Sequence, residues 1–119
     1  MTPEMRALAR RAVACKGWRW MRGMSNDQGQ TIDCVDLIPG KAYCGEWDAD
    51  MTALPDLTDP ATLGCLLALV REAHAVLFLQ VSVKISREHG YQFDCHPHHR
   101  GQWVDSEAEA LVAALEAAP

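Results

Sequence analysis

The sequence predicts an α+β fold in a single domain over residues 1–119, with a mainly antiparallel sheet and helices packed on it in α-β-α layers. Three observations carry this prediction. Helix-start signals with proline in the first turn stand at residues 2–3 and 59–60. Two windows alternate polar and apolar residues as paired strands do. At 119 residues the chain has room for one core. The expected order is helix, two strands, helix, two strands, helix.

The first helix is expected to begin at Thr2 and Pro3 and to end at Gly17. Threonine is a good N-cap, and proline fits the first helical position. The segment WRWMRGM (18–24) then alternates so that Trp18 and Trp20 share one face of a strand. TIDCVDLI (31–38) predicts its partner strand.

Residues 39–57 are rich in turn-forming residues and predict a long irregular loop, with a short strand near Tyr43. A loop of this length in a small domain is either functional or poorly ordered, and we interpret it as a variable insertion. Trp47, between acidic residues, is a candidate partner contact at its tip.

The second helix is predicted from Asp59 as N-cap and Pro60 as first residue. VLFLQVSVKI (76–85) and YQFDCH (91–96) predict a β-hairpin around the turn REHG. In the first strand Leu79, Val81, Val83 and Ile85 are expected to face inward and Gln80, Ser82 and Lys84 outward. In the second, Tyr91, Phe93 and Cys95 alternate with Gln92, Asp94 and His96. Ser106 and Glu109 have capping-box spacing at the start of a last helix, and Trp103 is expected to staple that helix to the sheet. The predicted buried cluster is Leu66, Leu67, Val81, Val83 and Leu111.

Charge is distributed unevenly along the chain. Residues 1–22 hold six of the eleven basic residues and one acid, a net charge of +5, which leaves −10 for the remainder. One interpretation is pairing of these cations with acids elsewhere in the fold. The other is an anion-binding patch, in which a base stacks on tryptophan while a guanidinium holds phosphate. The candidate ligand-binding residues are Lys16, Trp18, Arg19, Trp20 and Arg22. General duplex nucleic-acid binding is not expected, because the acidic remainder would repel it.

The run FDCHPHHRG (93–101) raises the question of a metal or catalytic site. Structural zinc sites use spaced ligand pairs, and no companion pair to Cys95, His96, His98 and His99 is evident. We interpret the run as a polar strand end and expect its histidines to be exposed, without a stoichiometric metal and without another cofactor. A metal site and a catalytic histidine remain the alternatives. Phosphate-loop, G-x-S-x-G and H-E-x-x-H motifs do not occur, so an enzyme is not predicted.

The five cysteines are odd in number and widely spaced, which favours reduced thiols in a cytoplasm over a disulfide scaffold. No apolar run approaches the length of a membrane span, about 20 residues. A short amphipathic sheet favours a homodimer.

ACKGWRWMRGM and LPDLTDPATLGCLLALVREA, followed by a hairpin and SEAEALVAALEAA, resemble small phage and prophage proteins of the phage ABA sandwich domain family. The resemblance covers the chain to Met24 and residues 54–118, with residues 25–53 as an unmatched insertion. It implies an α-β-α layered protein in the cytoplasm of a bacterial host and carries over no active-site residues.

The function we expect is non-catalytic binding, as in counter-defence, by sequestering a nucleotide signal or blocking a host protein. Two alternatives stay open. One is a structural accessory protein that acts through self-assembly. The other is a metal-dependent hydrolase built on His96, His98 and Asp94.

Overall fold

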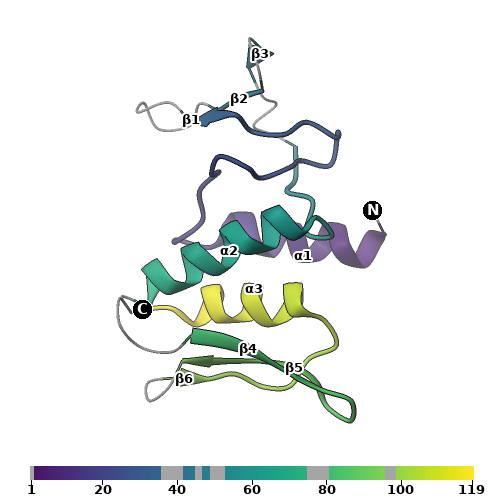
Figure 1. The fold of residues 1–119 in the computed structure, drawn as a ribbon, viewed down its shortest axis with the longest axis vertical. Helices are drawn as coiled ribbons and strands as arrows, with labels where there is room; N and C mark the ends of the chain where they lie inside the picture. Colours follow the sequence, from purple (N-terminus) through teal and green to yellow (C-terminus); the bar gives the residue numbers. More distant parts are fainter. Residues whose placement is uncertain (1, 36–41, 45–46, 49–52, 75–80, 96–98) are drawn as a thin grey trace.

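Within the residues that the structure describes, the chain forms three helices and two three-stranded antiparallel sheets (Figure 1). The structure is a computed structural model and describes residues 2–35, 42–44, 47–48, 53–74, 81–95 and 99–119. The helices are α1 (Pro3–Ala14), α2 (Pro60–Ala73) and α3 (Glu107–Ala117). One sheet has the order β1 (Cys34–Val35), β2 (Ala42–Cys44), β3 (Trp47–Asp48), and the other β4 (Val81–Ser86), β5 (Gly90–Cys95), β6 (His99–Arg100). The α+β class is therefore confirmed, whereas each predicted strand pair is a sheet of three strands.

All three helices begin at the predicted caps. The side-chain oxygens of Thr2, Asp59 and Ser106 accept the backbone N–H three residues on, at 3.1, 3.0 and 3.1 Å. Helix α1 ends at Ala14, before the predicted Gly17, and Cys15 is its C-cap. None of the described helices combines the length and apolar content that a membrane crossing would need.

Asp59 does more than cap α2, and its removal gives a testable prediction. Its Oδ2 accepts both the N–H and the hydroxyl of Thr62, whose Oγ1 in turn accepts the N–H of Ser25 at 2.9 Å. We expect Asp59→Ala to lower the free energy of unfolding by about 1–2 kcal/mol in urea denaturation. Asp59→Asn keeps an acceptor and should lose much less; equal losses would show that the cap does not stabilise the helix.

Helix α3, and not a sheet, occupies the middle of the layered domain. It contacts α1 and α2 on one side and β4 and β5 on the other, while the β1–β3 sheet lies at the opposite end of the molecule (Figure 1). The predicted α-β-α layering is wrong in this respect. The physical reason is that α3 buries more than half of its circumference, so it needs a packed layer on both sides. Its buried residues are Ala108, Ala110, Leu111, Val112, Ala114 and Leu115.

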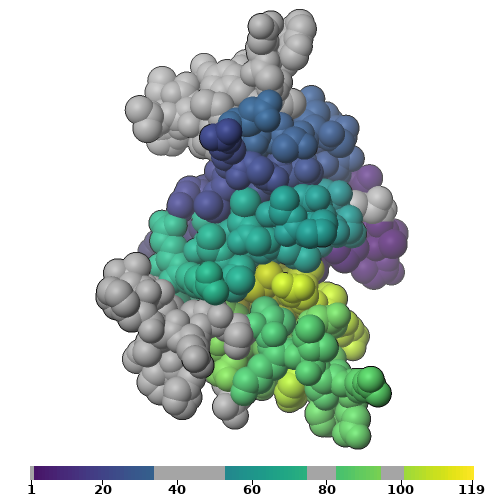
Figure 2. Space-filling model, viewed as in Figure 1, coloured from purple at the N-terminus to yellow at the C-terminus, as the bar shows by residue number. Residues whose placement is uncertain are grey.

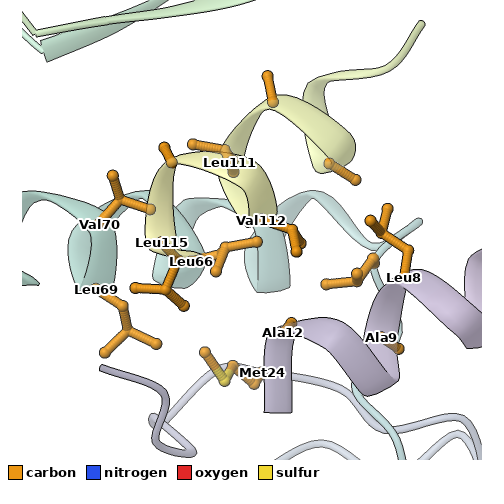
Figure 3. Packing of buried hydrophobic residues seen from close by; sticks show 14 of the residues in the cluster. Leu8, Ala9, Ala12, Met24, Leu66, Leu69, Val70, Leu111, Val112 and Leu115 are labelled. Atoms are coloured by element: carbon orange, nitrogen blue, oxygen red, sulfur yellow. The ribbon is translucent and has the colours of Figure 1, made fainter. Parts of the chain in front are cut away.

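The core lies where the three helices meet (Figure 3). Leu66 and Leu111 are completely buried, as predicted. Leu67 and Val83 are only partly buried, which corrects the predicted cluster, and the side chain of Val81 lies outside the described part. Leu69 and Val70 complete the α2 contribution, because the helix turns its buried face slightly away from Leu67.

No strand forms at residues 18–24, so that prediction is wrong. The chain turns at Gly23, which has a φ of 96°, and the N–H of Gly23 donates to the carbonyl of Ile32 at 2.8 Å. The alternation of the tryptophans reflects tertiary packing instead. Trp20 is buried, and the ring of Trp18 meets it edge-on with centroids 5.6 Å apart.

The middle of the chain agrees only in part with the sequence. Of the predicted second strand, residues 31–35 contain β1 and an isolated bridge between Thr31 and Ser25, and residues 36–38 lie outside the described residues. The short strand expected near Tyr43 is present as β2. The predicted order of two strands before α2 is therefore corrected to three short strands, β1–β3.

The predicted hairpin is present as β4 and β5, paired from Val81 with Cys95 to Ser86 with Gly90. Beyond β6, residues 101–104 run along the same edge of β5, the edge that faces away from β4. Tyr91 and Val104 exchange two backbone hydrogen bonds, of 2.7 and 2.8 Å. Because Asp94 pairs with Arg100 but Tyr91 pairs with Val104, the register shifts by one residue, which marks a β-bulge.

Candidate functional site

The five candidate ligand-binding residues follow α1 and differ in exposure. Lys16, Arg19 and Arg22 are exposed, and Trp18 is partly buried. Trp20 is only 8% exposed, so it offers no ring face on which a base could stack. The structure therefore brings two tryptophans together, but one of them serves the core.

Much of the basic N-terminal block is paired with acids from distant segments. The hydrogen bond from Arg19 lowers the pKa of the Glu72 carboxyl on α2, and it raises the pKa of Arg19. Because both side chains are exposed, this pair stabilises the fold only weakly. These contacts agree with the interpretation that the charge asymmetry is balanced within the fold. The ion pairs are Arg6–Asp27 at 3.3 Å, Arg11–Glu116 at 2.5 Å and Arg19–Glu72 at 2.7 Å.

A groove of about 560 Å³ lies where the three helices end. Lys16, Cys15 and Glu116 line it together with Gly17 and Leu115. Helix C-termini carry partial negative charge, and Glu116 adds to it. Lys16 is thus placed where a cation complements the helix ends, while Glu116 is already paired with Arg11, which also lines the groove.

The thiol of Cys15 in this groove is not an activated nucleophile. Burial raises its pKa, and the negative charge of Glu116 raises it further, while Arg11 opposes this. The thiol donates to the carbonyl of Arg11 at 3.3 Å. Since the thiolate is the reactive form, a raised pKa makes the residue slow to react. Cys15 and Cys65 are both free thiols.

This electrostatic setting predicts the alkylation rates of both thiols. We expect Cys15 to react with iodoacetamide at neutral pH more slowly in the folded protein than in urea, as followed by peptide mass spectrometry. Glu116→Gln should accelerate Cys15, because it removes the charge that disfavours the thiolate. Cys65 is the internal control, because burial and Asp59 raise its pKa. An equal acceleration of both thiols would contradict this explanation.

A second groove, of about 500 Å³, separates α3 from the bulged strand at 101–104. Phe93, Val104 and Ala114 line it, with Arg11 and Glu109 also at its wall. Among the described residues no group of three or more His, Cys, Asp or Glu side chains is placed to hold a metal ion.

The histidine run lies at the junction of β5 and β6. The backbones of Cys95 and His99 pair across this junction. Their side chains, and the whole of His96 and His98, lie outside the described residues, so the predicted exposure of the histidines is not tested. The backbone of Trp47 belongs to β3, and its side chain lies outside the described part as well.

Gln92 and Asp94 alternate with apolar residues along β5, yet each is only 8% exposed. The segment that follows β6 explains part of this burial, because Nε2 of Gln92 donates to the carbonyl of Gly101 at 2.8 Å. The carboxylate of Asp94 forms an ion pair with Nζ of Lys84 at 2.9 Å. The acid of the hydrolase alternative is therefore engaged in a contact within the sheet.

The end of the β4–β5 hairpin carries exposed apolar side chains that were predicted to be covered. Ile85 is 75% exposed and Trp103 is 39% exposed. The ring of Trp103 packs on His89 at the hairpin turn, with centroids 5.5 Å apart. Ile85 lies opposite Tyr91 near the turn. Apolar and polar residues still alternate there, although little of the protein covers Ile85. A regular register would place Trp103 opposite Tyr91, but the one-residue bulge puts Val104 there instead. The sequence feature that could have indicated the bulge is Gly101, which precedes it.

Sequence reasoning also missed the buried polar turn around Asn26, which is 1% exposed. Its Oδ1 accepts the N–H groups of Gln28 and Gln30, at 3.0 and 2.9 Å, and its Nδ2 donates to the Gln30 side chain. All these polar atoms have partners, so the turn is structural. The tract SNDQGQ identifies a turn but not its burial.

Neither a family model nor a curated protein nor a solved structure matches this chain.

Proposed function

We propose that this is a non-catalytic binding protein and that its partner is another protein, contacted through Trp103. The observation that carries the proposal is the exposed indole held on the ring of His89. Tryptophan is enriched in the energetic centres of protein interfaces, because a rigid ring covers much apolar area. A tilted stack on His89 limits the rotation of the indole, so less conformational entropy is lost on binding.

Nucleotide sequestration is less well supported than a protein partner. Trp20 is buried, and Arg19 already pairs with Glu72. A phosphate would have to displace this acid. The hydrolase alternative depends on His96 and His98, and its acid, Asp94, is held by Lys84.

The setting of the proposal comes from the resemblance to phage proteins. In that setting the partner is a protein of the bacterial host, and binding would block its action against the phage. The partner chemistry that fits Trp103 is an apolar pocket that accepts an indole.

Site-specific crosslinking tests this proposal. A photoreactive amino acid at position 103 should capture one host protein of defined mass in infected cells. Position 13 on α1 is the matched control, because Val13 is also 39% exposed. Trp103→Ser should weaken the affinity of the purified pair at least about tenfold, while Val13→Ser changes neither affinity nor melting temperature.

The same experiment separates the competing functions. Equal capture at both positions, or no discrete product at position 103, would refute the protein-contact proposal. Titration calorimetry against cyclic and linear nucleotides supplies the other arm. Binding that Arg19→Glu abolishes and Trp103→Ser preserves would replace the proposal with nucleotide sequestration.

A further inference from the structure

We propose that β4 pairs with β4 of a second copy of this chain in an antiparallel, two-fold arrangement. β4 is the outer strand of its sheet, six residues long. In the described part of the chain no group forms a hydrogen bond to its outer edge. Residues of this hairpin lie at the surface of the face drawn in Figure 2, in green. An open edge of this length is a template for another strand. This inference is independent of the function proposed for Trp103.

The contacts of β5 show which backbone groups the edge presents. Tyr91 and Phe93 direct their backbone hydrogen bonds toward Val104 and Gly101, away from β4. Backbone groups alternate sides along a strand, so Gln92 and Asp94 bond to β4, at Lys84 and Ser82. The intervening residues Val81, Val83 and Ile85 therefore point their N–H and carbonyl groups outward.

One register of the paired strands satisfies these groups and the side chains together. With Val83 opposite Val83 of the second copy, Ile85 lies opposite Val81, and Ser82 lies opposite Lys84. Apolar positions then meet apolar positions, and polar positions meet polar ones, as stable cross-strand pairs require. A shift that placed Lys84 opposite itself would set Val81 opposite Arg87, which lies beyond the end of β4, and so would lose an apolar pair.

The exposure of Ile85 is the second reason to expect that a copy of this chain pairs with β4. It is the most exposed large apolar side chain described, at 75%. The register above places an apolar residue of the second copy beside it.

Lysine on an edge strand normally discourages pairing. Here Nζ of Lys84 is held at 2.9 Å from the Asp94 carboxylate, which lies inward on β5. The positive charge of Lys84 therefore lies next to β5 and is neutralised by Asp94, so it does not oppose the pairing of another strand with β4.

Sedimentation velocity with a reducing agent present tests the proposal. We expect a reversible dimer of the 13.2 kDa chain. Hydrogen exchange should show the amides of Val83 and Ile85 protected only at concentrations where the dimer forms, whereas the amide of Lys84 is protected at all concentrations. Ile85→Lys should raise the dimer dissociation constant at least tenfold without lowering the melting temperature of the monomer.

Trp103→Ser is the control, and it should leave the dimer intact. A monomer at every concentration would overturn the proposal, and the edge would then be open to a foreign strand. A dimer that survives Ile85→Lys, or one that leaves the Val83 amide unprotected, would overturn it as well, because the interface would lie elsewhere. Loss of host-protein capture at position 103 with the dimer unchanged would count against the proposed function alone.

Discussion

Replacing Gly90 with alanine should lower the free energy of unfolding by about 3 kcal/mol or more, the largest effect expected of alanine at any of the described glycines. Gly90 has a φ of 89°, a conformation that side chains disfavour. An added Cβ would also overlap the backbone carbonyl oxygen of Val104. That carbonyl accepts the N–H of Tyr91 at 2.7 Å, so it cannot move aside without breaking the link between β5 and the bulged strand.

Two other glycines separate the contribution of backbone conformation from that of the close approach of Val104, in the same urea-denaturation experiment. Gly29 has a φ of 79° but open space around its Cβ position, so Gly29→Ala should cost about 1–2 kcal/mol, for conformation alone. Gly64 lies within α2 with no neighbour to clash, so Gly64→Ala should stabilise by about 0.5–1 kcal/mol. Similar losses for Gly90 and Gly29 would mean that the approach of Val104 contributes nothing.

Leu66→Ala should lower the free energy of unfolding by about 2–5 kcal/mol. Leu66 has no exposed surface and lies where α2 faces α3 (Figure 3). Deleting its side chain leaves a cavity between helices that cannot close without moving α3 on its other contacts. Leu67→Ala is the matched control on the next residue and should cost clearly less, since Leu67 is only partly buried. Equal losses in thermal or urea unfolding would show that the phase of α2 is misassigned.

The helix boundaries were the most predictable part of the fold, because their signals are local. Thr2, Asp59 and Ser106 each cap a helix through their own side chain, and an oxygen three residues before an N–H needs no information from elsewhere. The β4–β5 hairpin is local for the same reason, since the two strands are joined by a short turn.

Layer order and the strand at 18–24 could not be read from such signals. A period of two identifies residues that alternate in burial, and Trp20 is buried by distant helices rather than by a neighbouring strand. In α3, Leu111 and Leu115 predicted one apolar stripe, and the buried alanines that widen it were overlooked because alanine is equally common on exposed helices.

The candidate site was predictable only in its charges. The excess of cations in residues 1–22 anticipated pairing, but Glu72 and Glu116 are far away in sequence, so their identity required the fold. Exposure of Trp103 followed from a one-residue bulge, which the local alternation of apolar residues does not reveal.

The central position of α3 has a consequence for synthesis on the ribosome. Of the described elements α3 is the last in the chain, and it lies between the helical layer and the β4–β6 sheet. Until it leaves the exit tunnel, Leu8 and Leu66 have no partner on that side, and the hairpin has no helix to cover Phe93. The first two helices and the hairpin therefore hold exposed apolar surface until α3 has left the tunnel. Chaperones that bind emerging chains have their opportunity in that interval, and a synonymous codon change that slows translation before residue 107 would prolong it.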